Sequence, residues 1–317
     1  MKIHKNIQDF KAKKPILTVG TFDGVHLGHK KILSVLTEEA EKNKGESVVF
    51  TLYPHPRKVL NPDFKDLFLL NTLDEKIQLL EKAGINNFII YPFTKDFANL
   101  TSCDFIESIL CNKLKIKKLI VGYDHRFGKD KQDNLQILQN CAKPFGTEIL
   151  KVEPFSLNGK KVSSTKIRNA LLSGNIIEAN ECLGYDYFLS GKVVSGNRIG
   201  RTIGFPTANI NIHEEKLLPA SGVYAVKIII DGKEHNGMLN IGSRPTINAG
   251  GKTSTEVHIF DFNRDIYGKV IYVYFKKFIR NEIKFSTKYE LKKQIEKDKE
   301  ETDYFFKKES GKLKLFS

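Results

Sequence analysis

The sequence predicts an α/β fold with a doubly wound parallel sheet, followed by an antiparallel β-barrel. From Ile16 to about Gly184, short apolar strands alternate with segments of helical period, a pattern typical of a parallel sheet covered by helices. After Tyr185, short β-rich runs follow one another with turn residues between them, which favours a barrel. A length of 317 residues also suggests two domains. We therefore place one domain at residues 1–185 and a second at residues 186–317.

The first half contains the strands and helices of the expected parallel sheet. Thr72 and Glu75 have the spacing of a capping box, and Gly84 ends the helix that they begin. Ligands of doubly wound sheets bind beyond the carboxyl ends of the strands, so a site is expected there. The expected strands are residues 16–19, 48–52, 88–91, 118–122 and 147–152. The expected helices follow residue 29 and span residues 72–83, 102–114 and 163–173.

Residues 18–29, Thr-Val-Gly-Thr-Phe-Asp-Gly-Val-His-Leu-Gly-His, join the first of these strands to a helix. His26 and His29 are spaced i, i+3, so both imidazoles can reach one side of the first helical turn. A helix N-terminus offers unpaired N–H groups and a positive dipole end, which suit a phosphate. Gly28 leaves room for a phosphate to approach the backbone. The alternative is a pair of surface histidines at a helix cap.

Two further polar motifs lie in the first half. Residues 122–128, Gly-Tyr-Asp-His-Arg-Phe-Gly, follow a strand, where Arg126 could face a phosphate and Asp124 could accept hydrogen bonds. Residues 162–168, Val-Ser-Ser-Thr-Lys-Ile-Arg, open a helix, where hydroxyls and N–H groups point at one spot beside basic side chains. Each motif alone is also compatible with an ordinary polar turn or cap.

The second half combines barrel strands with a glycine-rich stretch at residues 196–209. Asp231-Gly232 between two apolar runs indicates a hairpin. The glycines of residues 196–209 could form an arch over phosphates, although a structural turn is the alternative. Thr287 and Glu290 form a capping box, from which an amphipathic helix to about Lys308 is expected to pack on the barrel. The expected strands are residues 187–194, 223–230, 234–241, 255–259 and 270–278.

These motifs resemble those of one known family. Residues 21–29 resemble the nucleotide-binding signature of the His-x-Gly-His nucleotidyltransferases, in the version of the bacterial bifunctional riboflavin kinase/FAD synthetases. Gly-Phe-Pro-Thr-Ala-Asn at residues 204–209 resembles the flavokinase signature, and further strings match the same family in order. The resemblance covers nearly the whole chain. It implies that the second domain phosphorylates riboflavin to FMN and the first adenylylates FMN to FAD, with ATP as co-substrate and Mg²⁺ or another divalent cation.

The resemblance also implies roles for individual residues. Glu256 matches the catalytic base, which takes the proton of the ribityl 5′-hydroxyl, and Thr207 and Asn209 match the metal ligands. His26, His29 and Arg168 are expected to act in adenylyl transfer. Expected nucleotide-binding residues are Gly20, Phe22, Asp23, Gly24, Gly28, Asp124, Ser164, Thr165, Gly196, Arg201 and Gly204. Expected flavin-binding residues are Pro54, Arg126, Phe127, Arg280 and Glu282.

Composition limits the partners and the compartment. The chain has 51 basic and 37 acidic residues, a formal charge of +14, which fits phosphate-rich substrates, nucleic acid or simply a lysine-rich surface. The dispersed lysines argue against a nucleic-acid partner, and we expect no membrane partner. The resemblance implies riboflavin, FMN, FAD and ATP as ligands. No apolar run approaches the roughly 20 residues of a membrane helix. We expect a cytoplasmic protein, whose oligomeric state the sequence does not predict. The cysteines, expected as free thiols in a reducing cytosol, are Cys103, Cys111, Cys141 and Cys182.

Two rival hypotheses stay open at this level. In the first, one site alone is active, and the loop at residues 129–134 singles out the first domain as the silent one because it lacks a glycine expected in the family. In the second, the chain is a nucleic-acid-binding or regulatory protein, which predicts salt-sensitive binding. Thr246 and Tyr267 could contact ligand or be structural, and His258 is expected to be structural.

Overall fold

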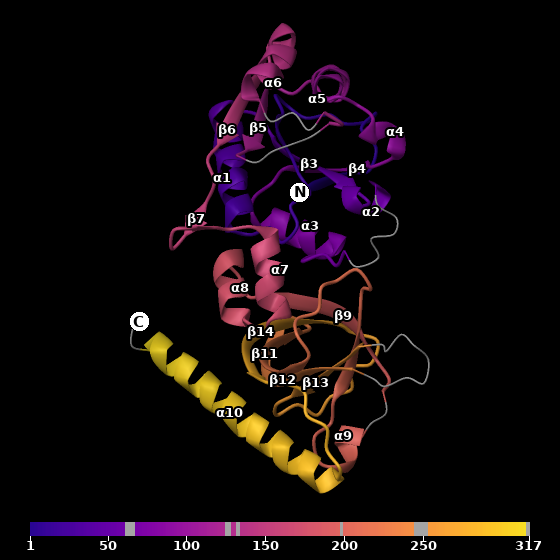
Figure 1. Ribbon diagram of the computed structural model, residues 1–317, viewed down its shortest axis with the longest axis vertical. Coiled ribbons are helices and arrows are strands. Elements are labelled where there is room, and N and C mark those ends of the chain that lie inside the picture. The colour runs from indigo at the N-terminus through magenta and orange to yellow at the C-terminus, as the bar shows by residue number, and fades with distance from the viewer. Residues whose placement is uncertain (61–66, 124–127, 131–133, 197–198, 244–252, 315–317) are drawn as a thin grey trace. The chain divides into compact units, whose positions relative to one another are not determined.

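A computed structural model gives the structure of residues 1–60, 67–123, 128–130, 134–196, 199–243 and 253–314 (Figure 1). The chain forms two compact units, Met1–Ser164 and Thr165–Ser317. The first contains a parallel sheet with helices and the second a closed antiparallel barrel, so the predicted fold class is confirmed. Among the helices of the described ranges, none combines the length and the apolar character needed to cross a bilayer.

The first unit is built on a six-stranded sheet in the order β1-β4-β3-β2-β5-β6. All neighbouring strands are parallel. The strand order reverses between β2 and β5, which makes this the switch point where doubly wound folds bind ligands. The five strands expected from the sequence are present, and β1 at the edge is an addition. The strands are β1 (Lys2–His4), β2 (Ile16–Val19), β3 (Ser47–Tyr53), β4 (Asn87–Pro92), β5 (Lys118–Gly122) and β6 (Glu148–Val152).

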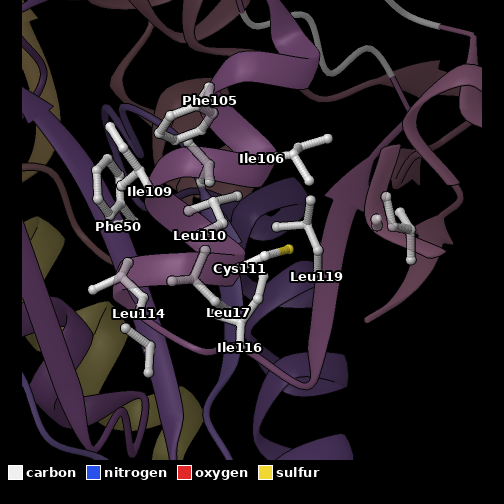
Figure 2. Close-up of a cluster of buried hydrophobic side chains, with 14 of the residues drawn as sticks. Leu17, Phe50, Phe105, Ile106, Ile109, Leu110, Cys111, Leu114, Ile116 and Leu119 are labelled. Carbon is white, nitrogen blue, oxygen red and sulfur yellow. The ribbon is translucent and has the colours of Figure 1, made fainter. Parts of the chain in front are cut away.

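Helices cover both faces of this sheet. Alternate residues of one strand point to opposite faces, and Leu17 and Ile16 accordingly belong to two different apolar clusters. Figure 2 shows the cluster in which β2, β3 and β5 pack against α5 (Ser102–Phe105) and the π-helical segment η1 (Ile106–Lys113). The opposite face packs against α1 (Leu27–Lys42) and α3 (Leu73–Lys82). The remaining elements are α2 (Pro56–Leu60), α4 (Lys95–Ala98), α6 (Leu135–Ala142), η2 (Lys143–Phe145) and the hairpin β7 (Ser156–Leu157) and β8 (Lys160–Lys161).

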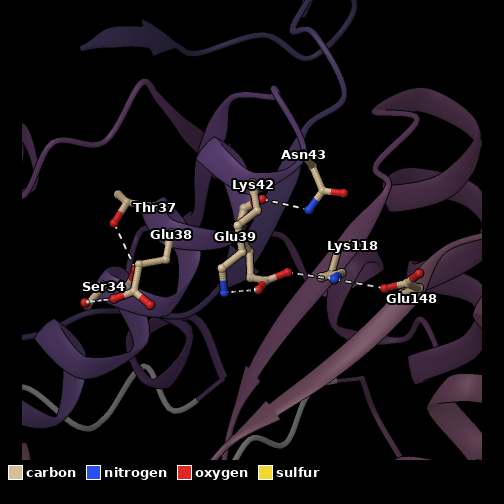
Figure 3. A network of polar contacts seen from close by, with 8 residues as sticks. All are labelled: Ser34, Thr37, Glu38, Glu39, Lys42, Asn43, Lys118 and Glu148. Atoms are coloured by element: carbon tan, nitrogen blue, oxygen red, sulfur yellow. Dashed lines mark hydrogen bonds and ion pairs between the residues drawn. The ribbon is translucent and has the colours of Figure 1, made fainter.

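A chain of ion pairs joins α1 to the sheet (Figure 3). Lys118 Nζ on β5 lies 2.7 Å from Glu39 Oε2 on α1 and 2.9 Å from Glu148 Oε2 on β6. Lys42 contacts the other Glu39 oxygen at 3.2 Å. The hydrogen bonds from Lys118 and Lys42 lower the pKa of Glu39. These contacts fix the helix that carries His29 against two strands.

The cysteines differ from the expectation of four free thiols. Cys103 on α5 and Cys141 on α6 form a disulfide, with their Cα atoms 5.5 Å apart. The expectation was wrong for this pair because residues 38 positions apart are brought together only when α5 and α6 pack in the same layer. Cys111 and Cys182 are free and buried, as expected.

The second unit is a closed barrel in the order β10-β13-β12-β11-β14-β9, with all neighbours antiparallel. Asp231 and Gly232 have positive φ angles of 51° and 77° and form the predicted hairpin turn between β11 and β12. The five expected strands are present, and β10 is an addition. The strands are β9 (Phe188–Val194), β10 (Ala208–Ile212), β11 (Gly222–Ile230), β12 (Lys233–Ser243), β13 (Thr253–Ile259) and β14 (Val270–Arg280).

Within the described residues, helices also pack on the barrel or connect its strands. The short α9 (Ile199–Thr202) follows β9, and α10 (Lys288–Lys314) begins at the predicted capping box and contacts β11, β12 and β14. The helices α7 (Ser164–Leu172) and α8 (Ile176–Leu183) also lie against the barrel: Ala220 N donates to Leu171 O, and Asn180 Nδ2 donates to Phe275 O. The sequence boundary at residue 185 groups these two helices with the first domain, whereas they pack with the second compact unit.

Candidate active sites

The first candidate site is the loop from β2 to α1, at the carboxyl end of β2 and beside the switch point of the sheet. His26 is the N-cap of α1, and its Nδ1 accepts a hydrogen bond from His29 N at 3.3 Å. The two imidazoles are stacked, with ring centroids 3.7 Å apart and planes inclined by 14°. The prediction that both rings reach one side of the first turn is therefore confirmed.

His29 has an unusual electrostatic environment. Its Nδ1 is buried and has no hydrogen-bond partner among the described residues. Burial, and then the nearby positive charges of His26 and Lys76, hold the pKa of His29 well below its ordinary value. His29 is therefore a neutral imidazole at neutral pH, in the first turn of α1.

Other residues of the loop contact the protein interior. Phe22 is 2% exposed and its ring lies 5.1 Å from that of His29. Asp23 is 3% exposed, and its Oδ1 accepts from the backbone N–H groups of Leu70 at 2.8 Å and Asn71 at 3.4 Å. Phe22 and Gly24 have positive φ angles of 46° and 92°, as the tight loop requires. These contacts fix the loop beneath the histidines.

The glycines of this loop have a packing reason. A Cβ built at Gly28 would lie 3.1 Å from the imidazole of His26, and one at Gly20 would lie 3.0 Å from the ring of Phe22. The imidazole of His26 thus lies against Gly28, and the role of Gly28 in nucleotide binding stays a prediction. Any side chain at either position would displace an aromatic ring of the site.

Other predicted residues of the first site lie at element ends. Ser164 begins α7, and its Oγ donates to the carbonyl of Asp23 at 2.8 Å. Thr165 and Arg168 follow in the first turns of that helix. Pro54 is exposed directly after the carboxyl end of β3. Three predicted residues, Asp124, Arg126 and Phe127, lie outside the described residues.

The second candidate site lies in the barrel, between β10 and β13. Thr207 Oγ1 donates to Glu256 Oε2 at 3.1 Å, and Asn209 is paired with Glu256 across the two strands. Gly196 lies against the Asn209 amide, because a Cβ built there would be 2.1 Å from Asn209 Nδ2. The structure therefore brings together the residues predicted as base and metal ligands. Within the described ranges, no three His, Cys, Asp or Glu side chains form a metal site, so a cation here would rely on hydroxyl, amide and substrate oxygens. Such hard oxygen donors suit Mg²⁺.

Family models match both halves of the chain. A model described as FAD synthetase matches residues 9–166, and a model described as riboflavin kinase matches residues 183–306. A bifunctional riboflavin kinase/FMN adenylyltransferase of Haemophilus influenzae is 42% identical over 92% of this chain and 94% of that protein. This chain belongs to the same bifunctional family. It carries a FAD synthetase domain followed by a riboflavin kinase domain.

Further relatives agree with this assignment. The bifunctional riboflavin kinase/FMN adenylyltransferases of Escherichia coli K12 and Bacillus subtilis are 39% and 37% identical, over 92% and 96% of this chain and of each relative. A solved structure from Streptococcus pneumoniae, described as a macrolide-efflux protein, has a TM-score of 0.86 and 33% identity and covers 95% of this chain and 98% of its own. The fold of both domains is thus shared with an experimental structure.

Two cavities meet at Thr207 in the riboflavin kinase domain. The larger, of about 510 Å³, is lined by both polar and apolar residues, and the smaller, of about 270 Å³, has mainly apolar walls and includes Glu256 in its lining. Thr207 lines both cavities, so groups bound in the two would approach each other beside Glu256. The larger is lined by Arg201, Thr207, Asn263, Arg264, Asp265 and Tyr267, among others. The smaller is lined by Phe205, Thr207, Glu256, Arg280, Glu282, Ile283 and Phe285, among others.

Arg280 lines the smaller cavity, but its guanidinium is bound to the protein. Its Nε and Nη2 donate to the two carboxylate oxygens of Asp298 on α10 at 2.8 and 2.7 Å. Asp298 is 3% exposed. Glu282 lines the same cavity, whereas Gly204 has open space around it and a φ of 90°. The charged group of Arg280 therefore fixes α10 as a wall of the cavity.

Two residues beside these sites were not predicted from the sequence. Asp298 is the partner of Arg280, and Lys76 on α3 is 9% exposed and donates to the carbonyl of Thr21 at 2.6 Å. Lys76 lies four positions before the buried Leu80, on the face of α3 that points inward. A charged residue on that apolar face is the feature of the sequence from which its importance could have been predicted. His258 bonds the Pro206 carbonyl through Nδ1 at 2.8 Å, which fits the structural role expected for it.

Proposed function

We propose that this chain converts riboflavin to FMN in its riboflavin kinase domain and FMN to FAD in its FAD synthetase domain, with ATP in both steps. The observation that carries the proposal is that each matched region holds its own polar cluster. One is the stacked pair of His26 and His29, and the other is Glu256 with Thr207. A protein with one silent site would need only one of them.

In the kinase step, Glu256 is the base. The 5′-hydroxyl of riboflavin gives its proton to the Glu256 carboxylate while its oxygen attacks the γ-phosphorus of ATP, and the bond to the β-phosphate oxygen breaks to release ADP. Thr207 orients the carboxylate through the 3.1 Å hydrogen bond. Thr207 and Asn209 would hold Mg²⁺, which neutralises phosphate charge when bound.

The two cavities of the riboflavin kinase domain suit the two substrates. Phe205, Ile283 and Phe285 give the smaller cavity apolar and aromatic walls, which fit a flat flavin ring. Arg201 and Arg264 line the larger cavity, which fits a nucleotide with its phosphates. In this arrangement the transferred phosphoryl group passes the point where both cavities meet.

In the adenylylation step, a phosphate oxygen of FMN attacks the α-phosphorus of ATP. A new phosphoanhydride bond forms, the bond between the α- and β-phosphates breaks, and pyrophosphate leaves. No protein nucleophile is required, so the protein aligns the reactants and stabilises developing charge. His26, His29 and the N–H groups at the start of α1 would do so from one loop, and Ser164, Thr165 and Arg168 from the start of α7.

We further propose that the enzyme is cytoplasmic and has no nucleic-acid or membrane partners. Its substrates are small phosphorylated or hydroxylated molecules, and the 51 basic residues are dispersed along the chain rather than gathered in one arm. Salt-sensitive binding to nucleic acid would contradict this part of the proposal.

One incubation tests the proposed function. Purified protein is mixed with riboflavin, ATP and Mg²⁺, and flavins are separated by chromatography over time. We expect FMN first and FAD later, and we expect excess chelator to stop both steps until Mg²⁺ is restored. Accumulation of FMN without FAD would show that only the riboflavin kinase domain is active. Absence of both products would overturn the whole proposal.

A further inference from the structure

A buried lysine lies behind the loop of the first site. Lys76 is on α3 and is 9% exposed. Its ammonium donates to the carbonyl oxygen of Thr21 at 2.6 Å. Burial lowers the pKa of Lys76, and the nearby negative charge of Asp23 opposes that shift. Removing an ammonium group from water is costly. A buried lysine therefore indicates that its charge or its hydrogen bond has a role here that an apolar side chain could not fill.

The segment that contains Lys76 holds the loop at three points. The backbone N–H groups of Leu70 and Asn71 donate to Asp23 Oδ1, and Lys76 donates to Thr21. Phe22 lies between these two anchored residues, and its ring contacts the ring of His29. A shift of Thr21 would therefore move Phe22 and, through it, His29.

Lys76 also acts on His29 through its charge. Its positive charge contributes, after burial and His26, to the low pKa of His29. The charged and titratable groups that face His29 are thus His26 at the helix cap, Lys76 on α3 and, through Lys76, Asp23 in the loop. Burial and the positive charges of His26 and Lys76 keep the His29 ring uncharged.

We propose that Lys76 is a positioning residue of the adenylyl-transfer site, which fixes the loop at Thr21 and, through Phe22, the position of His29. The inference rests on the proposed function, because it assigns His29 to that reaction. Lys76 itself does not contact the reacting atoms. Its contribution is to hold His26 and His29 in the arrangement that the reactants require, where a misplacement of 1 Å can cost roughly 100-fold in rate.

The test compares variants of the full-length protein. Lys76→Met removes the charge and the donor at similar length, Lys76→Arg retains both, and Lys82→Met changes an exposed lysine of the same helix. We expect Lys76→Met to lower kcat for FMN adenylylation roughly 10- to 100-fold, with partial recovery in Lys76→Arg and no change in Lys82→Met. Riboflavin phosphorylation by the same molecules should be unchanged, which confines the defect to the FAD synthetase domain. An unchanged circular dichroism spectrum and unfolding transition of each variant report that this domain is folded.

A second measurement does not depend on turnover. NMR titration of the His29 imidazole should show a higher pKa in Lys76→Met than in wild type, because a neighbouring positive charge is lost. If wild type makes no FAD but this shift occurs, the proposed function fails while the effect of Lys76 on His29 stands. Adenylylation by Lys76→Met within twofold of wild type, or an unchanged His29 titration, would overturn the inference.

Discussion

At the scale of residues, the first site depends on a histidine that stays uncharged. A protonated His29 beside His26 and Lys76 would place three positive groups in a partly buried loop. The neutral ring avoids this repulsion, and its Nδ1 is buried without a hydrogen-bond partner among the described residues. The positive potential offered to phosphates then comes from the helix N-terminus rather than from His29.

The low pKa of His29 predicts a pH dependence of stability. Between pH 6.5 and the lowered pKa of the folded state, the unfolded chain binds more protons, so the free energy of unfolding falls as pH falls. The slope from one group is at most about 1.4 kcal/mol per pH unit. Denaturant titrations of wild type and His29→Gln from pH 7.5 to 5 should give a smaller slope for the variant. Equal slopes would show that His29 is not held neutral.

Glu256 offers the sharpest test at the second site. We expect Glu256→Gln to lose FMN formation by at least 100-fold, the size typical of a missing general base, because the amide cannot accept the hydroxyl proton. Formation of FAD from supplied FMN should stay within twofold of wild type. Both rates are read in one chromatographic assay, and loss of both activities together would contradict separate sites.

The sequence predicted which residues form each cluster better than it predicted their contacts. The stacked histidines and the grouping of Thr207 with Glu256 follow from motifs in which spacing and element ends fix the geometry. The partners of Asp23 and Arg280 did not follow, because they lie 47 and 18 positions away in the chain. Only the packed fold brings such residues together.

At the scale of elements, strong periodicity was a reliable guide. Each strand with a continuous or alternating apolar run is present, and the capping boxes of α3 and α10 form as spaced. The strand β1 was missed because it has three residues, of which only Ile3 is apolar. The strand β10 was missed because it begins within residues 196–209, which were interpreted as an arch over phosphates. Tertiary packing decides which compact unit α7 and α8 join. The periodicity of apolar residues predicts the two helices but not the unit on which they pack.

The helix α10 yields a prediction about stability. Asp298 binds Arg280 through two hydrogen bonds and also accepts from Gln294, while its side chain is almost fully buried. Without Asp298, the guanidinium of Arg280 is left as an unpaired, partly buried charge. Asp298→Ala should therefore lower the free energy of unfolding of the second unit by about 2–4 kcal/mol.

The matched control for this prediction is Glu296→Ala. Glu296 lies on the same helix, is half exposed and is 4.0 Å from Lys292, so its loss should cost no more than about 0.5 kcal/mol. Chemical denaturation followed by circular dichroism measures both variants. Equal effects would show that the Arg280–Asp298 pair does not anchor α10.

At the scale of the whole molecule, the pair of His26 and His29 lies in one compact unit and the pair of Thr207 and Glu256 lies in the other. The residues that support His26 and His29 all belong to the first unit, and those that support Glu256 all belong to the second. Damage to one cluster should therefore leave the other intact. The two activities would then be linked only by FMN, the product of one step and the substrate of the other.

This independence predicts that two inactive variants complement each other in solution. The double variant His26→Ala/His29→Ala should convert riboflavin to FMN and stop, while Glu256→Gln should use supplied FMN but not riboflavin. Mixed together with riboflavin, ATP and Mg²⁺, they should form FAD, because FMN released by one molecule can bind the other. The reaction should show a lag that shortens as the concentration of the second variant rises, whereas each variant alone at doubled concentration should give no FAD. A mixture that forms no FAD, although each variant performs its own half-reaction, would mean that FMN does not reach the second site through solution.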